Sequence, residues 1–447
     1  MAKVGFISLG CPKNLVDTEV MLGLLQKEGH VITADRTEAE IIVVNTCGFI
    51  ESSKKESIEA ILEAADLKKS GRCRRLVVTG CLAERYPGEI RTELPEVDAF
   101  LGTDQIGEIA RAVSGAAVGS PGSCDRSRAG RYLYDHATPR LLSTPPYSAY
   151  IKIAEGCDHT CSFCIIPKIR GPFRSRSIPS LVQEARSLAE RGVREITLVS
   201  QDTTSFGTDL SLRDGLAQLL EALSEVEDIR WIRFLYVYPD MMNDRLVEAI
   251  SAHKQVCRYI DMPLQHVSSA VLKAMRRGGN RASLEKLIER VRTGIPEVTL
   301  RTTMLVGHPG ETEEDFRELK RFCRDMEFDR LGVFAYSDEA GTLSRTYRDK
   351  VHGRTAERRR RELMEQQLEI VVEKNRRLVG REFPVLVEGT SRESDLLLQG
   401  RLESQAPEID GVCLINDSEV EPVTAGEFRT ILITRALEHD LLGTILR

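Results

Sequence analysis

Three cysteines lie close together near the middle of the chain, in the segment CDHTCSFC. Cys157, Cys161 and Cys164 have the spacing C-x3-C-x2-C and directly follow an apolar run that predicts a strand. Three thiolates on one short loop can bind one face of an iron–sulfur cube, because each thiolate needs to reach only its own iron atom. Such clusters normally take four protein thiolates, so three would leave one iron open to an external ligand.

Two other interpretations fit the same segment. One is a zinc site that uses His159, and the other is three unrelated core cysteines. Zinc sites favour paired C-x2-C units, and no second pair lies nearby. Three core cysteines so close together would be unusual in a loop rich in Asp, His, Thr and Ser. An iron–sulfur site is therefore the favoured interpretation.

A second set of cysteines is spread through the first hundred residues. Cys11, Cys47 and Cys81 each follow an apolar run that predicts a strand: Val4–Leu9, Ile41–Val44 and Leu76–Val78. The carboxyl ends of parallel strands share one edge of a sheet, so we expect these cysteines to converge on one site. Glycines beside them, Gly10, Gly48 and Gly80, would permit close backbone approach.

The alternative is that these three are buried apolar cysteines, since Cys is among the most buried residue types. Their matching position in each β/α repeat favours a site. The other cysteines show no such pattern and are interpreted as ordinary residues: Cys73, Cys124, Cys257, Cys323 and Cys413.

Further polar loops follow other predicted strands. The turn that holds Gly307, Gly310 and Glu311 could offer backbone amides to a ligand, but a tight structural turn explains it equally well. Gln201 begins a polar segment that could bind a ligand or cap a helix. His266 is expected to be a structural histidine with its hydrogen bonds satisfied.

The strands and helices around these loops predict three domains of an α/β chain. The pattern predicts alternating strands and helices over residues 1–117 and a linker over residues 118–142. Strands and helices alternate again over residues 143–375. Residues 376–447 form a last domain whose pattern predicts strands alone. Six strands are expected in the central part: Ala149–Ala154, Glu195–Ser200, Arg230–Val237, Tyr259–Met262, Val298–Val306 and Asp329–Ala335. Six β/α repeats fit either a doubly wound sheet or a partial barrel. A charged helix is expected over 354–378, and the last segment predicts a small antiparallel β-barrel.

The amino-acid composition argues against a nucleic-acid-binding protein and a membrane protein. The 447 residues carry a net charge of −6, so the chain is not a globally basic nucleic-acid binder. A single Trp and 5% aromatic residues argue against a surface built for stacking on bases. No apolar run is long enough to span a bilayer, and the N-terminus lacks a secretory pattern, so we expect a cytoplasmic protein without a membrane partner. Eleven cysteines in such a protein indicate metal or redox chemistry.

The cysteine spacing, with an aromatic residue before the last Cys, resembles the radical S-adenosylmethionine (SAM) superfamily. The upstream motifs GCPKN, NTCGF and TGCLAERY are similar to the N-terminal domain of methylthiotransferases, and the tail is similar to a TRAM domain. Within that family, SLGCPKNLVDTE, YIKIAEGCDHTCSFCIIPKIRG and QAPEIDG most resemble the RimO type. That type methylthiolates the β-carbon of an aspartate on small-subunit ribosomal protein S-twelve.

The resemblance implies two 4Fe–4S clusters, one on Cys157, Cys161 and Cys164 and one on Cys11, Cys47 and Cys81. It also implies a flavodoxin-like N-terminal domain and a partial (β/α)6 barrel. SAM would bind the open iron and yield a 5′-deoxyadenosyl radical after reduction by an electron donor. Positions loosely matched to SAM contacts are Phe163, Gln201, Gly307, Gly310 and Glu311, although His308 departs from the apolar residue expected in that loop.

The net charge of the C-terminal segment favours a protein substrate over RNA. Residues 380–447 contain six Arg, no Lys and 13 Asp and Glu, a net charge of −7, and the rest of the chain is nearly neutral. An acidic module would repel RNA and attract a basic ribosomal protein, free or in the ribosome. The runner-up is a tRNA adenosine methylthiotransferase of the MiaB type, which the acidic tail disfavours. A non-catalytic, metal-bound ribosome-binding scaffold is the alternative of another class, and it predicts no SAM cleavage.

Overall fold

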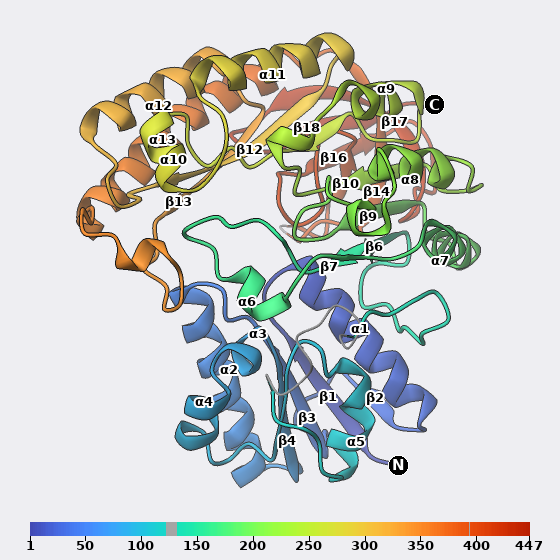
Figure 1. The fold of residues 1–447 in the computed structure, drawn as a ribbon. Coiled ribbons are helices and arrows are strands. Elements are labelled where there is room, and N and C mark those ends of the chain that lie inside the picture. Colours follow the sequence, from blue (N-terminus) through green and yellow to red (C-terminus); the bar gives the residue numbers. More distant parts are fainter. Residues whose placement is uncertain (122–131, 393) are drawn as a thin grey trace.

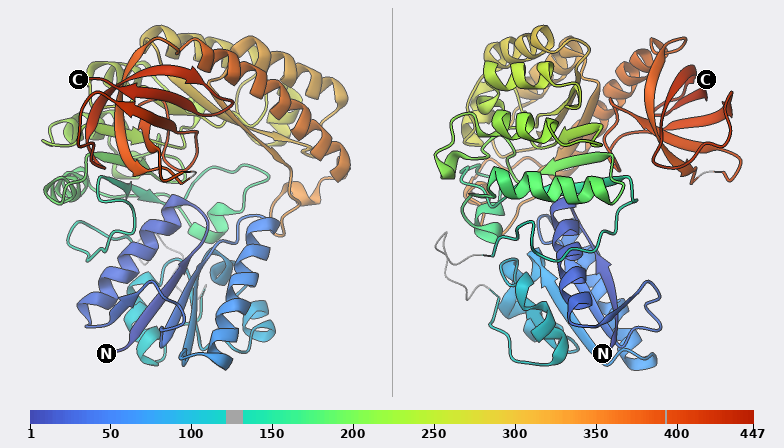
Figure 2. Two further views of the ribbon diagram at one scale, coloured as in Figure 1. Left: turned by 180° about the vertical axis from the view of Figure 1, so that it is seen from behind. Right: turned by 90° about the vertical axis from the view of Figure 1, so that its right-hand side faces the viewer.

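The computed structural model describes residues 1–121, 132–392 and 394–447, and Figure 1 shows three parts that follow one another along the chain. The N-terminal α/β domain (blue) lies beneath a central barrel, and a C-terminal β-barrel (red) packs against one side of the central barrel, as Figure 2 shows. The segment that carries α6 lies between the N-terminal sheet and the central barrel.

The N-terminal domain is built on a five-stranded parallel sheet with the strand order β2-β1-β3-β4-β5. This is the doubly wound order of flavodoxin-like folds. The strands are β1 Lys3–Ser8, β2 Val31–Thr33, β3 Ile41–Thr46, β4 Arg75–Gly80 and β5 Ala99–Leu101. The helices are α1 Pro12–Lys27, α2 Glu51–Ser70, α3 Cys81–Arg85, α4 Pro87–Glu93 and α5 Ile109–Ser114, with a 3-10 turn at Ile106–Glu108.

Strand β3 shows why the sequence forms this sheet. All six of its residues are buried, because helices cover both faces of a parallel sheet. The strand therefore reads as an unbroken apolar run that ends in two polar residues. The expected strands at the cysteines are confirmed, while the short edge strand β2 was not predicted.

Six parallel strands form the central part as two three-stranded sheets, β10-β9-β6 and β11-β12-β13. A bridge between Ile232 and Val256 connects them, so the repeats form a partial barrel rather than a doubly wound sheet. The strands are β6 Ser148–Lys152, β9 Glu195–Val199, β10 Trp231–Phe234, β11 Tyr259–Asp261, β12 Thr299–Val306 and β13 Arg330–Ala335, with a small pair β7 Ala154–Glu155 and β8 Arg174–Ser175.

Helices surround this barrel. They are α6 Ile166–Arg170, α7 Ile178–Glu190, α8 Gly215–Ser224, α9 Asp244–Ala252, α10 Ser269–Ala274, α11 Arg281–Gly294, α12 Glu313–Met326 and α13 Gly353–Arg376, with 3-10 turns at Thr208–Leu210, Pro239–Met241 and Ser344–Thr346. Helix α13 is the expected charged helix, and it packs against β13. Of the helices in the described part of the chain, none is long and apolar enough to cross a bilayer.

The C-terminal module is a closed five-stranded barrel with the order β14-β15-β16-β18-β17. Its strands are β14 Glu382–Thr390, β15 Leu398–Leu402, β16 Cys413–Ser418, β17 Phe428–Ala436 and β18 Leu441–Ile445. The pairs are antiparallel except β16–β18, which is parallel. An odd number of strands cannot close a ring with antiparallel pairs alone, so the expected antiparallel barrel contains one parallel pair.

A buried charge cluster attaches this module to the central barrel. The Arg401 guanidinium, on β15, donates to both carboxylate oxygens of Glu195 at the start of β9, and Arg233 Nε donates to Glu195 Oε1 at 3.2 Å. Burial alone would raise the pKa of Glu195, but the two arginines lower it to about 2. Glu195 is therefore a fixed anion between two modules.

Part of the expected linker packs against both domains that it connects. Arg140 Nη2 bonds Glu19 Oε2 of α1 at 2.5 Å, and Arg140 Nη1 bonds Glu184 Oε1 of α7 at 2.7 Å. Residues 122–131, including Cys124, lie outside the described residues. The exact domain boundaries stay predictions.

Candidate active site

The three N-terminal cysteines lie at one edge of the sheet. Cys11 precedes α1, Cys47 follows β3, and Cys81 is the first residue of α3. Gly10 has a positive φ of 90°, and a Cβ atom there would lie 3.2 Å from the Cys47 Sγ. The absence of a side chain thus lets the Cys11 loop approach Cys47, as the strand-end argument predicts.

The Cys157–Cys164 loop runs from β7 to α6 and is fixed by backbone hydrogen bonds. Cys157 N donates to Gly171 O at 3.0 Å, and Ser162 N donates to Met275 O at 2.9 Å. The three cysteines line a cavity of about 740 Å³, which residues 341–343, Arg345 and Thr346 also line. A cavity of this size can hold a group much larger than a metal ion.

The cysteine thiols must lose their protons before they can bind a metal. Burial raises the pKa of Cys157 to about 11 and of Cys164 to about 12. Burial likewise raises the pKa of Cys81 to about 11, although the Arg170 charge opposes this. The thiols are therefore protonated near neutral pH, and a bound metal must displace those protons.

A fully buried arginine connects the two cysteine loops. Arg170, six residues after Cys164, ends α6, and its Nη2 lies 3.4 Å from Cys81 Sγ. Its Nη1 bonds Asp17 Oδ2 at 2.7 Å and Glu155 Oε2 at 3.1 Å. One side chain thus contacts a thiol of the N-terminal set from the segment that carries the second set.

Lys152 completes this network. Its ammonium contacts the Asp17 carboxylate, and it lies 2.7 Å from Glu155 Oε2. Burial would raise the pKa of Glu155, but Arg170 and Lys152 hold it well below its usual range. In this network the side chains of Lys152 and Arg170 each contact the two carboxylates, those of Asp17 and Glu155.

Gln201 and Asp202 contact this region after β9. Gln201 Nε2 donates to Glu155 Oε1 at 3.0 Å. His159, from the cysteine loop, bonds Asp202 Oδ2 at 2.6 Å and stacks on Tyr238 at 3.8 Å between ring centroids. His159 thus has a structural role in positioning the loop.

The turn after β12 is closed by its own contacts. Gly307 N donates to the Glu311 carboxylate, and Gly310 N donates to Asp349 O at 2.7 Å. A Cβ atom at Gly307 would lie 2.4 Å from that of Ala356, so α13 packs directly on the turn. These contacts fit the structural-turn alternative, and contact with SAM stays a prediction.

His308 joins this turn to the cysteine loop through its Nε2, 3.2 Å from Ser162 Oγ. Burial lowers the pKa of His308 to about 4, so the ring is neutral. Phe163 packs beside it against Val271, Met275 and Leu305. His266 accepts from Ser268 N at 3.0 Å through Nδ1, and its buried Nε2 has no hydrogen-bond partner among the described residues, so it is only half satisfied.

The zinc alternative finds no support in the geometry. Within the described residues, no three His, Cys, Asp or Glu side chains are arranged to hold a single metal ion. A cluster whose irons each take one thiolate needs a wider arrangement than a single ion does. Four of the cysteines interpreted as ordinary are buried: Cys73, Cys257, Cys323 and Cys413.

The sequence analysis missed the residues of the domain junction: Lys13, Asp17, Lys152, Glu155 and Arg170. All five lie in the two long segments around the cysteines, SLGCPKNLVDTE and YIKIAEGCDHTCSFCIIPKIRG. Nothing in the sequence indicated that the two segments meet, because the contacts between them join distant positions, such as Asp17 with Lys152, 135 residues apart, and with Arg170, 153 residues apart.

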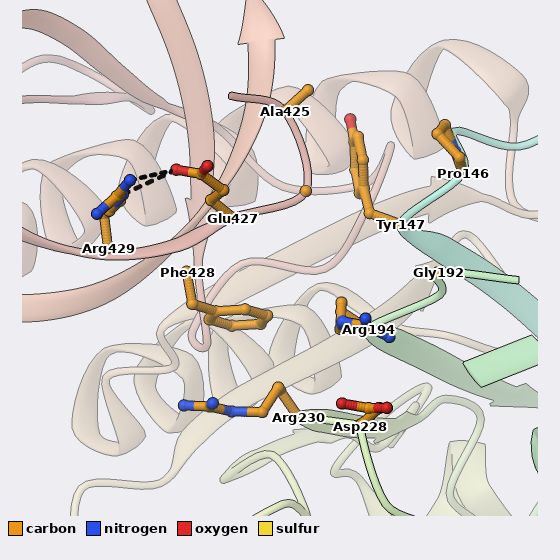
Figure 3. A pocket seen from close by; sticks show the side chains of 11 residues that line it. Pro146, Tyr147, Gly192, Arg194, Asp228, Arg230, Ala425, Glu427, Phe428 and Arg429 are labelled. Carbon is orange, nitrogen blue, oxygen red and sulfur yellow. Dashed lines mark hydrogen bonds and ion pairs between the residues drawn. The ribbon is translucent and has the colours of Figure 1, made fainter. Parts of the chain in front are cut away.

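A second cavity, of about 510 Å³, lies between the central barrel and the C-terminal module (Figure 3). Tyr147, Arg194 and Arg230 precede strands β6, β9 and β10, so this cavity faces the amino ends of the strands. The cysteine loop follows their carboxyl ends. Arg429 in this cavity is paired with Glu427 at 2.6 Å, and the cavity contains no cysteine.

Comparison with known proteins agrees with this three-part structure. Three family models match: "Uncharacterized protein family UPF0004" over residues 3–102, "Radical SAM superfamily" over 151–323, and "TRAM domain" over 379–446. A protein of Solibacter usitatus named ribosomal protein uS12 methylthiotransferase RimO is 52% identical, covering 99% of this chain and 95% of the relative. The RimO protein of Geobacter sulfurreducens is 46% identical over 99% and 98%.

The chain belongs to the RimO family of methylthiotransferases. Among solved structures, the radical SAM methyltransferase TsrM of Kitasatospora setae matches with a TM-score of 0.55, at 15% identity over 74% of this chain and 73% of that one. At this identity the likeness concerns the fold alone, and it confirms the radical SAM architecture of the RimO-family chain.

The junction network gives a testable prediction. Arg170→Met removes one cation and leaves two buried carboxylates sharing Lys152, so the domain junction should weaken by about 3–5 kcal/mol. Hydrogen exchange of the α1 amides would measure the loss. Arg354→Met, at an exposed arginine of α13, is the matched control and should change nothing. Unchanged protection in Arg170→Met would mean that the network does not hold the domains together.

Proposed function

We propose that this protein transfers a methylthio group to the β-carbon of an aspartate of ribosomal protein uS12, in the cytoplasm. Membership of the RimO family supports the reaction. The observation that carries the proposal is the pair of three-cysteine sets that Arg170 joins, since each set lacks a fourth thiolate.

The donor sets fit the clusters that this reaction needs. We assign one 4Fe–4S cluster to Cys157, Cys161 and Cys164, which share a cavity, and one to the N-terminal set: Cys11, Cys47 and Cys81. Cationic groups contact a thiol in each set, Arg170 at Cys81 Sγ and Arg277 Nη1 at 3.7 Å from Cys161 Sγ. Positive charge beside the sulfurs offsets the negative charge of ligated thiolates.

Radical chemistry suits an aspartate β-carbon, because its C–H bond is not acidic enough for a general base. The bound clusters and SAM would supply the radical and the methylthio group. The chain's own residues hold these groups. His159 and Ser162 fix the cysteine loop, and SAM contacts are proposed at Phe163, Gln201, Gly307, Gly310 and Glu311.

Charge supports a protein substrate over tRNA. Acidic side chains of the C-terminal module are exposed, including Glu382, Asp417, Glu419 and Glu421. Arg401 is buried in ion pairs, and Asp410 and Glu388 are largely buried as well, so the acidic excess of the module is carried by its exposed side chains. Such a surface favours a basic ribosomal protein, and an electron donor is the remaining partner that the reaction requires.

The function is tested by one paired assay. Anaerobically reconstituted protein is mixed with SAM, a reductant and a peptide of the uS12 target loop, with tRNA in a parallel tube. Mass spectrometry should find the methylthio group on the peptide aspartate only. Addition to tRNA alone would overturn the substrate, and absence of both products and of 5′-deoxyadenosine would favour a non-catalytic scaffold.

The N-terminal cysteines give a second prediction. Cys11→Ala should abolish methylthiolation and lower the iron content by about four atoms per chain, while 5′-deoxyadenosine still forms at the other site. Cys73→Ala, a buried cysteine of the same domain, is the control and should keep both. Normal methylthiolation by Cys11→Ala would remove the N-terminal cluster from the mechanism.

The acidic C-terminal module gives a third prediction. Asp417→Lys combined with Glu421→Lys should weaken binding of uS12 about three- to tenfold at low salt, and the difference should shrink as salt rises. The matched control reverses Glu365 and Glu369, two exposed residues of α13. Biolayer interferometry measures the binding. An equal loss in both double variants would assign the effect to overall charge rather than to this module.

A further inference from the structure

Lys13 differs from the other cations of the domain junction. Lys152 and Arg170 each contact two carboxylates, those of Asp17 and Glu155. Lys13 is also buried, with 8% of its surface exposed, yet within the part of the chain that the structure describes no carboxylate lies within 4 Å of its ammonium. A buried ammonium without an anion is costly, so such a charge calls for an explanation.

The contacts of this ammonium place it in the mouth of the central barrel. Lys13 Nζ donates to Ser200 O at 3.3 Å, and it lies 3.5 Å from the ring centroid of Tyr236. Ser200 follows β9 and Tyr236 follows β10, so both mark the carboxyl ends of barrel strands. An ammonium has three N–H donors, and the Ser200 carbonyl takes one of them.

The same lysine is tied to the N-terminal cysteines by the chain itself. It lies two residues after Cys11, in the first turn of α1, and α1 also carries Asp17 of the junction network. The N-terminal domain thus extends one cation from its cysteine edge to the carboxyl ends of β9 and β10. The loop with the second cysteine set follows β6 and β7 at the same end of the barrel.

We propose that Lys13 Nζ binds the side-chain carboxylate of the target aspartate and so positions the carbon that receives the methylthio group. This inference rests on the proposed function. The β-carbon of aspartate is bonded directly to that carboxylate carbon, so a fixed carboxylate fixes the reacting carbon to within one bond. Holding a reactant in this way is a large part of how a site accelerates a reaction.

Nearby groups agree with this role. The next residue after Ser200, Gln201, leaves its Oε1 without a hydrogen-bond partner among the described residues, although its Nε2 is bound to Glu155. Gln201 Oε1 could accept a hydrogen bond from a bound peptide, while Lys13 Nζ donates to its carboxylate. The substrate carboxylate would give Lys13 the anion that its neighbours Lys152 and Arg170 already have.

The test compares two peptides of the uS12 target loop, one with the target aspartate and one with asparagine there. Fluorescence anisotropy measures binding to anaerobically reconstituted protein with SAM and no reductant. The intact protein should bind the aspartate peptide about 10- to 100-fold more tightly, because a charge-assisted hydrogen bond is lost with asparagine. Lys13→Met should bind both peptides alike, and Lys13→Arg should recover part of the discrimination.

Two controls separate the possible causes. Lys254→Met, at an exposed lysine away from the junction, should discriminate as the intact protein does. Iron content and the electron paramagnetic resonance spectrum of reduced Lys13→Met should match those of the intact protein. If Lys13→Met still prefers the aspartate peptide, the role of Lys13 is overturned while the proposed function stands. Equal loss of both peptides with an altered spectrum would assign Lys13 to the cluster instead. If the intact protein binds neither peptide, the proposed substrate fails, and this inference fails with it.

Discussion

The arrangement of this protein depends on the carboxylate of Asp17, which Lys152 and Arg170 share inside the domain junction. Four charges buried together are stable only as a complete set, because removal of any one leaves its partners without compensation. The hydrogen bonds within these ion pairs are short and directional, and they therefore fix the orientation of the N-terminal domain against the barrel. Surface ion pairs could not do this, since water and salt weaken them.

The orientation of the two domains brings the two cysteine sets to one junction. Cys11, Cys47 and Cys81 follow three strands of one parallel sheet, and the second set lies on one loop after β7. Each set therefore lies at the carboxyl end of parallel strands, where ligands ordinarily bind. The junction turns the two edges toward each other, and Arg170 contacts Cys81 from the segment that follows Cys164. The two cysteine sets are therefore connected through one side chain, although they belong to different domains.

The sequence predicted local features well and long-range contacts poorly. The strand before Cys47 was recognisable because β3 is buried on both faces and reads as an apolar run. The edge strand β2 was missed, since three residues with partly exposed side chains leave no periodic pattern. The choice between a doubly wound sheet and a barrel depends on how β10 meets β11, which no local pattern encodes. Arg170 was missed for the same reason, because its partners come from another domain.

The backbone is strained at the carboxyl end of β10, beside Lys13. Tyr236 follows β10 with a φ of 66°, a left-handed conformation that costs a residue with a side chain about 1–2 kcal/mol. Its N–H donates to Asp261 Oδ2 at 3.1 Å, which holds this conformation, and its ring lies beneath the Lys13 ammonium. Strain of this kind persists where surrounding contacts enforce it, and it concentrates at functional sites. In this conformation the Tyr236 ring faces Lys13 of α1, the helix that begins directly after Cys11. The end of β10, Lys13 and the Cys11 loop are therefore held in one arrangement.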